Sequence, residues 1–268
     1  MSRRHRVAAL GVCLGALVFS ALSAAPSSAY ARTSTVGHPE RATQETASGW
    51  CGEGFETLPS DVCYIDGRTK GPRKTLVIWL HGVIGKDTNW SWNHQRMLQR
   101  LAKHHNIEIL FPKAPASGTV YAWPGTAEAQ ARTEQALIDQ WTAAKNILEE
   151  RERQAFEEVF VFGFSSGAYF ASSLAMRGRL DVDGYATFAG GQSHKIEKEP
   201  VVRFAPVYVG VCAKDSTTEK HSRAFAKSLS AAGIPRMVSV QQVGHDLSEA
   251  HFAGALAFLR SKRKVATV

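Results

Sequence analysis

Short apolar runs alternate along the chain with longer segments of helical character. The runs are rich in Val, Ile, Leu and Phe, and they occupy residues 76–80, 107–111, 159–162, 184–188, 206–211 and 237–243. Because most of their positions are apolar, they are typical of strands that are buried on both faces. The sequence therefore predicts an α/β fold with a mostly parallel central sheet and helices on both of its faces.

The clearest helical pattern lies between the second and third runs. Apolar residues recur there three or four positions apart, at Leu137, Trp141, Ala144 and Leu148. This spacing predicts a long amphipathic helix over residues 126–150. Further helical segments are expected over residues 168–176 and 222–232. An antiparallel pair of strands within residues 54–65 is expected to precede the sheet.

A glycine lies two positions before Ser165 and another two positions after it, in the sequence Gly163-Phe164-Ser165-Ser166-Gly167. A serine on a tight strand-to-helix turn needs small residues at these positions, because a Cβ there would meet the neighbouring strand or helix. Such a turn exposes the serine hydroxyl, and the following helix directs free N–H groups at any anion that forms there. The motif predicts a nucleophile elbow for acyl transfer.

A serine nucleophile needs a base and an acid that orients the base. Asp215 follows the run at 206–211, and His245 follows the run at 237–243, so both are expected in loops at the carboxyl edge of the sheet. The chain order Ser, Asp, His is that of elbow-type triads. Asp215 is also explained as a cap of the helix that begins near Thr217, in which case Glu219 or Asp246 replaces it.

The other histidines of the exported chain, apart from His81, are expected to be solvated surface groups. They are His38, His94, His104, His105, His194, His221 and His251.

An oxyanion hole requires two backbone N–H groups directed at one point. The Ser166 N–H, directly after the nucleophile, is the first candidate. The second is the Val83 N–H, in the sequence His81-Gly82-Val83-Ile84-Gly85 that follows the first run. The His81 ring is expected to orient this loop by hydrogen bonding. A plain strand-to-helix turn explains the two glycines equally well.

These motifs resemble those of secreted serine hydrolases of the α/β-hydrolase superfamily, in the style of small carboxylesterases, phospholipase-like enzymes and the depolymerase/feruloyl-esterase group. Pro112-Lys113-Ala114-Pro115 and the later Trp123 resemble a Pro-x-Ala-Pro segment and tryptophan that border the substrate pocket in small carboxylesterases. The chain departs from that pattern in its Phe-Ser-Ser elbow and in Pro124-Gly125, where an aspartate is common. Substrate preference is therefore not carried over.

Four aromatic residues are expected near the substrate: Trp90, Trp92, Tyr121 and Trp123. They either stack against an aromatic acyl group, a sugar or a polyester, or they pack a lid. His, Cys, Asp and Glu show no metal-ligand spacing, and no glycine-rich phosphate loop is present. We expect neither a metal nor a cofactor.

The N-terminus has the form of a signal peptide. Three arginines precede an apolar stretch over residues 7–25, and Ala29-Tyr30-Ala31 is a small-residue cleavage pattern. We expect a signal peptide at 1–31, a flexible segment at 32–48 and a single α/β-hydrolase domain at 49–268. The mature protein is expected to be extracellular or periplasmic, without stable membrane insertion. A retained membrane anchor is the alternative.

The charge of the chain gives no sign of a nucleic-acid partner. Removal of residues 1–31 takes away three arginines and no acidic residue, so the formal net charge falls from +8 to +5. The one basic cluster, residues 261–264, is typical of a solvated tail. We expect a monomer that acts on a small-molecule or polymeric ester.

Export permits disulfides, and we predict one between Cys51 and Cys63, which flank a loop that contains glycine and proline. Cys212, at the end of a run, is expected to be a small buried apolar residue. The predicted activity is hydrolysis of carboxylic esters by Ser165, His245 and Asp215. A peptidase, a transacylase and a secreted binding protein with an inactive triad remain alternatives.

Overall fold

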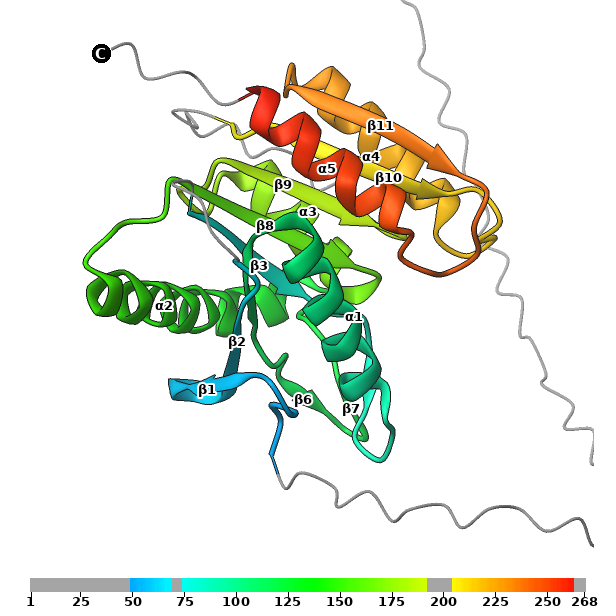
Figure 1. The fold of residues 1–268 in the computed structure, drawn as a ribbon. Coiled ribbons are helices and arrows are strands. Elements are labelled where there is room, and N and C mark those ends of the chain that lie inside the picture. The colour runs from blue at the N-terminus through cyan, green and yellow to red at the C-terminus, as the bar shows by residue number, and fades with distance from the viewer. Residues whose placement is uncertain (1–48, 69–73, 192–203, 263–268) are drawn as a thin grey trace, which may run out of the picture. The chain divides into compact units, whose positions relative to one another are not determined.

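The structure is a computed structural model that describes residues 49–68, 74–191 and 204–262 (Figure 1). The predicted signal peptide at 1–31 and lead-in at 32–48 lie outside the described residues, and the expectation of a single domain at 49–268 stays a prediction. None of the helices in the described part of the chain combines the length and apolarity needed to cross a bilayer.

The central sheet has the order β1-β2-β5-β3-β8-β9-β10-β11 within the described residues. Its strands are β1 (Glu56–Leu58), β2 (Val62–Asp66), β3 (Thr75–Leu80), β5 (Glu108–Phe111), β8 (Glu158–Phe164), β9 (Gly184–Phe188), β10 (Val207–Cys212) and β11 (Arg236–Gln241). From β5 to β11 all neighbours are parallel, whereas β2 is antiparallel to both β1 and β5. The predicted mostly parallel α/β sheet is confirmed.

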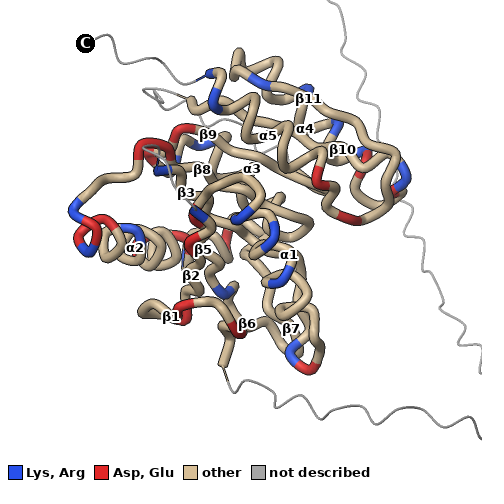
Figure 2. The backbone as a smooth tube through the Cα atoms, in the orientation of Figure 1, with Lys and Arg blue, Asp and Glu red and all other residues tan. Residues whose placement is uncertain are grey.

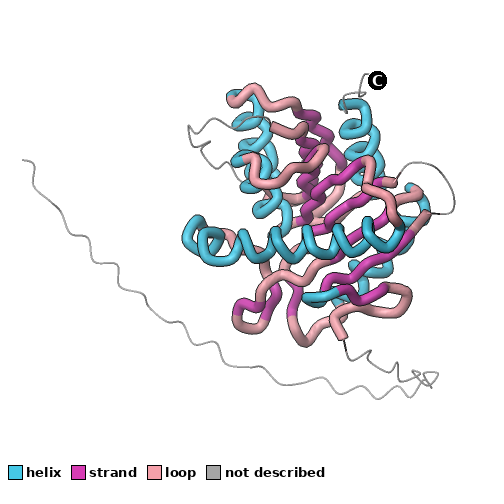
Figure 3. The backbone as a smooth tube through the Cα atoms, turned by 90° about the vertical axis from the view of Figure 1, so that its left-hand side faces the viewer, coloured by secondary structure: helices cyan, strands magenta, loops and turns pink. Residues whose placement is uncertain are grey.

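Helices cover both faces of this sheet (Figures 1 and 3). They are α1 (Trp90–His105), α2 (Ala127–Glu152), α3 (Ser166–Arg177), α4 (Glu219–Ala231) and α5 (Glu249–Lys262). One hydrophobic cluster joins the sheet to α2, α3 and α4, and a second joins it to α1 and α5. The helix predicted over 126–150 is α2, and the Thr126 hydroxyl caps it by accepting from the Ala129 N–H.

The strand β11 differs from the expectation of burial on both faces. Met237, Val238 and Val240 are each more than two fifths exposed. The physical reason is the position of β11 at the end of the strand order, where it has one neighbour instead of two. An apolar run alone does not distinguish an edge strand from a central one.

A small second sheet, not predicted from the sequence, lies among the loops that precede α2. It consists of β4 (Ile84–Gly85), β6 (Ala116–Ser117) and β7 (Val120–Tyr121), in the order β4-β7-β6. In its register Ile84 pairs with Tyr121. The segment after Val83 is therefore fixed against Tyr121.

Charged residues of both signs are interspersed along the described chain, and α2 carries both (Figure 2). Some of them join elements, as Arg260 of α5 does with Glu158 of β8, where Nε lies 3.0 Å from Oε2. The expectation that the chain binds no nucleic acid stays a prediction.

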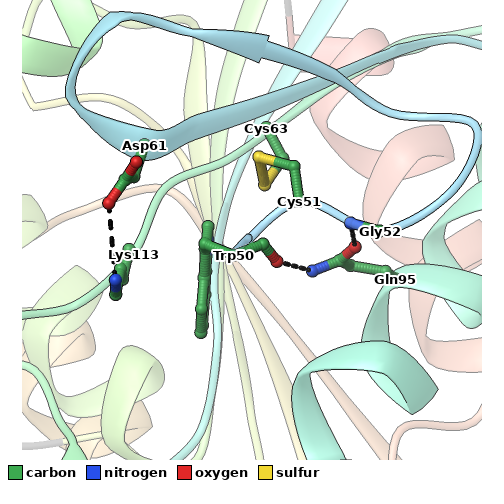
Figure 4. The surroundings of a disulfide bond; sticks show 7 residues. All are labelled: Trp50, Cys51, Gly52, Asp61, Cys63, Gln95 and Lys113. Carbon is green, nitrogen blue, oxygen red and sulfur yellow. Dashed lines mark hydrogen bonds and ion pairs between the residues drawn. A yellow bond between two sulfur atoms is a disulfide. The ribbon is translucent and has the colours of Figure 1, made fainter. Parts of the chain in front are cut away.

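The segment just before β1 is attached at two points. Cys51 and Cys63 form a disulfide that joins it to β2 (Figure 4). On the other side, the Gln95 Nε2 of α1 donates to the Trp50 carbonyl at 2.7 Å, and the Gly52 N–H donates to Gln95 Oε1 at 2.5 Å. Trp50 is thereby held between β2 and α1.

Replacing both cysteines by serine, Cys51→Ser with Cys63→Ser, is expected to destabilise the protein by about 3 kcal/mol, because the disulfide closes a loop in the unfolded chain. The two residues are 12 positions apart. For a domain of this size the melting temperature should fall by roughly 6–12 °C. A reductant should lower the melting temperature of the parent protein by a similar amount and leave that of the double variant unchanged. A parent protein whose melting temperature does not respond to reduction would contradict the prediction.

Candidate active site

Ser165 lies on the turn between β8 and α3 in a backbone conformation that is rare for a residue with a side chain. Its φ is 52° and its ψ is −117°. A Cβ built on Gly163 would lie 2.3 Å from the Gly167 carbonyl oxygen, and one on Gly167 would lie 2.0 Å from the Leu80 carbonyl oxygen. Both positions therefore require glycine: the first faces the helix backbone and the second faces β3.

The structure brings Ser165, His245 and Asp215 together in one hydrogen-bonded chain. Ser165 Oγ lies 2.9 Å from His245 Nε2, and His245 Nδ1 lies 2.6 Å from Asp215 Oδ2. The histidine comes from the loop after β11 and the aspartate from the loop after β10. With Nδ1–H donating to the carboxylate, Nε2 is free to accept the serine proton.

Asp215 bonds both to the histidine and to the turn that leads into α4. Its Oδ1 accepts from the Thr217 N–H at 3.0 Å and from the Thr218 N–H at 3.2 Å, just before α4, and the Thr218 hydroxyl donates to Oδ2. Burial alone would raise the pKa of Asp215, but the hydrogen bonds from Thr218 and His245 outweigh it and hold the pKa below its usual value. Asp215 thus stabilises the turn before α4, whose N-cap is Thr218, while it bonds to His245.

His81 fixes the loop that follows β3. Its buried ring accepts the Ala114 N–H at Nε2, at 3.1 Å, so Nδ1 carries the proton and donates to the Gly82 carbonyl. The His81 carbonyl oxygen accepts from the Gly167 N–H at 3.0 Å and from Trp123 Nε1 at 2.8 Å. Burial lowers the pKa of His81 to about 3. A neutral ring in this position orients the loop and does not act as a base.

The loop lies directly against the nucleophile. A Cβ on Gly82 would lie 3.3 Å from Ser165 Cβ. Within the described residues neither the Val83 N–H nor the Ser166 N–H donates a hydrogen bond, and Val83 is half exposed. Both N–H groups are thus available to an oxyanion, although their use in an oxyanion hole stays a prediction. The Ser166 hydroxyl accepts from the Trp123 N–H at 3.2 Å.

A cavity of about 370 Å³ opens beside this loop. Its lining includes Trp50, Ile84, Gly85, Lys86, Lys113 and Tyr121. Sequence reasoning missed Trp50 and Lys86, whereas Lys113 belongs to the Pro-x-Ala-Pro segment that was expected to border the substrate pocket. Trp50 is distant in sequence from every motif, and its ring reaches the cavity by stacking on Phe111, with ring centroids 5.3 Å apart.

Of the four aromatic residues expected around the substrate, Tyr121 lines this cavity and the other three do not. Trp123 is 4% exposed and stacks on Phe170 in the core, while its indole N–H supports the His81 carbonyl. Trp92 stacks under the Arg96 guanidinium at 4.4 Å, and Trp90 is exposed at the start of α1. The expected role of all four residues at the substrate stays a prediction.

The expectation that the remaining histidines are solvated is wrong for His94, His105 and His251, whereas His38 and His194 lie outside the described residues. His105 stacks on Phe252, and its Nε2 is buried without a partner among the described residues. His251 is fully buried, because α5 packs its first turn against β10. His94 lies against Phe164, and the Nδ1 of its ring is buried without a partner among the described residues. His104 and His105 lie beside Glu249, with potential ligand atoms within 4.8 Å of one another, a grouping that sequence spacing does not show.

Stability should fall on acidification because buried histidines stay neutral in the folded protein. Burial lowers the pKa of His81 to about 3 and that of His94 to about 4, from 6.5. Below pH 6.5 the unfolded chain binds protons that the folded chain excludes, so this stability is present above pH 6.5 and is lost progressively towards pH 4 and 3. Each histidine can lower the free energy of unfolding by up to about 1.4 kcal/mol for each pH unit of acidification in this range.

Urea unfolding at pH 7, 6 and 5 measures the slope of the unfolding free energy against pH. The variant His94→Leu should flatten it, whereas His221→Leu, which replaces an exposed histidine, should leave it unchanged. An equal slope in the parent protein and in His94→Leu would contradict the assignment for His94.

Cys212 is buried at the end of β10, and burial raises the pKa of its thiol. The thiol is therefore protonated at neutral pH and is no rival to Ser165 as nucleophile.

The sequence profile of the dienelactone hydrolase family matches residues 121–251, a range that contains Ser165, Asp215 and His245. This match and the fold support a serine hydrolase of the α/β-hydrolase type that is similar to the dienelactone hydrolases. A comparison with curated protein sequences found no match.

Solved structures show the same fold at low sequence identity. YahD with malic acid is 18% identical, with a TM-score of 0.55, and the match covers 76% of this chain and 99% of that one. A carboxylesterase from Mesorhizobium loti is 18% identical, with a TM-score of 0.56 and coverage of 78% and 99%. Esterase PE8 is 21% identical, with a TM-score of 0.53 and coverage of 75% and 97%. At these identities the likeness concerns the fold alone.

Proposed function

We propose that this protein is a secreted serine esterase that cleaves carboxylic esters through an acyl-enzyme. The observation that carries the proposal is the continuous hydrogen-bonded chain from Ser165 Oγ through His245 to Asp215, on a strained turn whose glycines admit no larger residue. The dienelactone hydrolase match and the esterase names among the structural neighbours favour the same chemistry.

In the first half-reaction, His245 Nε2 takes the hydroxyl proton while Ser165 Oγ attacks the ester carbonyl carbon. The carbonyl oxygen becomes an oxyanion that accepts from the Val83 and Ser166 N–H groups. The ionised Asp215 stabilises the histidine cation. The tetrahedral intermediate then expels the alcohol oxygen, which takes the proton from His245 and leaves an acyl group on Ser165.

In the second half-reaction, His245 removes a proton from water, and the resulting hydroxide attacks the acyl carbon. The same two N–H groups donate hydrogen bonds to the second oxyanion. Ser165 leaves and regains its proton from His245, and the carboxylic acid is released. The neutral His81 takes no part in these proton transfers and keeps the loop of Val83 in place.

The secreted location is part of the proposal. The arginines before the apolar stretch at 7–25 and the Ala-x-Ala pattern at 29–31 support export. The disulfide between Cys51 and Cys63 is consistent with an oxidising compartment outside the cytoplasm. We expect the exported protein to begin at residue 32, which N-terminal sequencing of protein from the culture medium or periplasm checks.

Labelling with a fluorophosphonate tests the proposal, because such probes react with an activated serine beside an oxyanion hole. The purified protein is labelled, digested and mapped by mass spectrometry. Modification of Ser165, abolished in His245→Ala, would support the esterase. A protein that is folded by circular dichroism and remains unlabelled would contradict it and favour a non-catalytic binding protein.

A further inference from the structure

Two consecutive histidines at the end of α1 meet the first turn of α5. The His105 ring stacks on Phe252, with ring centroids 5.3 Å apart, and the His104 ring meets the His105 ring edge to face at 4.7 Å. Glu249 precedes Phe252 by three positions, so the two side chains share one face of α5. His104 Nε2 lies 3.7 Å from Glu249 Oε1. Two imidazole rings and one carboxylate are thereby brought to one point.

The spacing of these three groups is close to that of metal ligands. One potential ligand atom from each of His104, His105 and Glu249 lies within 4.8 Å of the other two. Nitrogen and oxygen ligands bound 2.0–2.1 Å from a tetrahedral zinc ion lie about 3.4 Å from one another. The side chains of His104 and Glu249 are 66% and 64% exposed, so both can rotate to close the remaining distance.

The three groups are not engaged by other charged partners. Among the described residues, Glu249 forms no ion pair with a lysine or an arginine. The Nε2 of His105 is buried and has no hydrogen-bond partner in the described part of the chain. Nitrogens of His94 and His251 share that state, but within the described residues His105 alone has a second histidine and a carboxylate at ligand distance. Because buried polar atoms usually have a partner, a ligand from outside the chain is expected here.

The donor set and its position in the fold select the kind of ion. Imidazole nitrogens with one carboxylate suit Zn²⁺, whereas Ca²⁺ and Mg²⁺ prefer oxygen ligands alone. The helix α1 ends at Asn106, whose left-handed φ of 55° terminates it, so the carbonyl end of the helix dipole lies beside the two rings and favours a cation. The nearby Lys103 is exposed, so water screens its opposing charge.

We propose that His104, His105 and Glu249 form a zinc site that joins the end of α1 to the start of α5. Water completes the coordination as the fourth ligand. Both helices pack on the sheet within one hydrophobic cluster, and the ion adds a direct link between them. The expectation that the chain binds no metal rested on spacing along the sequence, and this site draws its ligands from two distant segments. The inference is independent of the esterase function.

Titration with zinc tests the site directly. The purified protein, produced without a polyhistidine tag, is freed of metal with EDTA, dialysed and titrated with ZnCl₂ in a calorimeter. One Zn²⁺ should bind per chain with a Kd of about 10 µM, weaker than a buried four-ligand site. Zinc at about a hundred times this Kd should raise the melting temperature by roughly 5–10 °C, because the ion binds the folded chain. CaCl₂ at the same concentration should not raise it.

Three variants assign the binding to the proposed ligands. His104→Ala, His105→Phe and Glu249→Gln should each weaken zinc binding by at least about tenfold and remove most of the rise in melting temperature. His105→Phe keeps an aromatic ring against Phe252, and the other two replace exposed side chains, so all three should fold. His221→Leu is the control, since it removes an exposed histidine of α4, and it should bind zinc like the parent protein.

The results that would overturn the site are distinct from those that concern catalysis. Absence of zinc binding to the parent protein overturns it. So does zinc binding that is unchanged in His104→Ala and Glu249→Gln, or a calcium effect on the melting temperature equal to that of zinc. Labelling of Ser165 by a fluorophosphonate in metal-free protein bears on the esterase alone and leaves the zinc site to be decided by the titration.

Discussion

Ser165→Ala should reduce kcat for ester hydrolysis by about 10⁴- to 10⁶-fold while leaving the fold intact. The substitution removes the one oxygen that lies 2.9 Å from His245 Nε2, and the residual rate is that of a bound ester attacked by water. The His245 hydrogen bond to Asp215 does not involve Ser165 and should persist. Steady-state kinetics measures the loss, and an unchanged circular dichroism spectrum and melting temperature show that it is not due to unfolding.

The neighbouring serine provides the matched control. Ser166→Ala keeps the backbone N–H and removes the hydroxyl that accepts from the Trp123 N–H at 3.2 Å. Its kcat should fall by no more than about tenfold, because this hydrogen bond only positions the loop. A Ser166→Ala protein less active than Ser165→Ala would reverse the assignment of the nucleophile.

Features that depend on nearby residues were predictable from the sequence. The run at 184–188 is β9 to the residue, and α2 begins and ends within two residues of the predicted helix. In these cases the apolar period and the capping residue lie inside the element itself. Gly163 belongs to this class as well, because its constraint arises from the Gly167 carbonyl within the same turn, whereas Gly167 is constrained by the distant Leu80 carbonyl of β3.

Features that depend on contacts between distant segments were not predictable. The sequence places Trp123 after the Pro-x-Ala-Pro segment but does not show that its ring packs on Phe170 of α3. Trp50 reaches the cavity because a disulfide and Gln95 hold its segment there. The strands of the small sheet have two residues each, too few to show an alternating pattern.

Histidine burial illustrates the same limit. His251 lies in the first turn of α5, a helix whose apolar residues form no single clear stripe, so the sequence does not show which side faces the sheet. In the structure its ring packs between Phe188 and Tyr208, with centroids 6.1 and 6.4 Å away. Packing of the whole helix, and not the residue type, decides its exposure.

Gly167→Ala should destabilise the protein by at least about 3 kcal/mol and abolish most activity, because the added Cβ would lie 2.0 Å from the Leu80 carbonyl oxygen. Alanine gains about 1 kcal/mol over glycine in a helix, which is too little to offset a clash between two backbone segments. Relief of the clash must separate α3 from β3, which breaks the Gly167 N–H bond to the His81 carbonyl, 3.0 Å long, and moves Val83 away from Ser165. Thermal unfolding should show a melting temperature roughly 6–12 °C lower.

Gly125→Ala is the matched control, since a Cβ there meets nothing within 4 Å, and it should change neither stability nor activity. A Gly167→Ala protein of normal stability and full activity would show that the elbow tolerates a larger residue and would remove the steric basis for the turn.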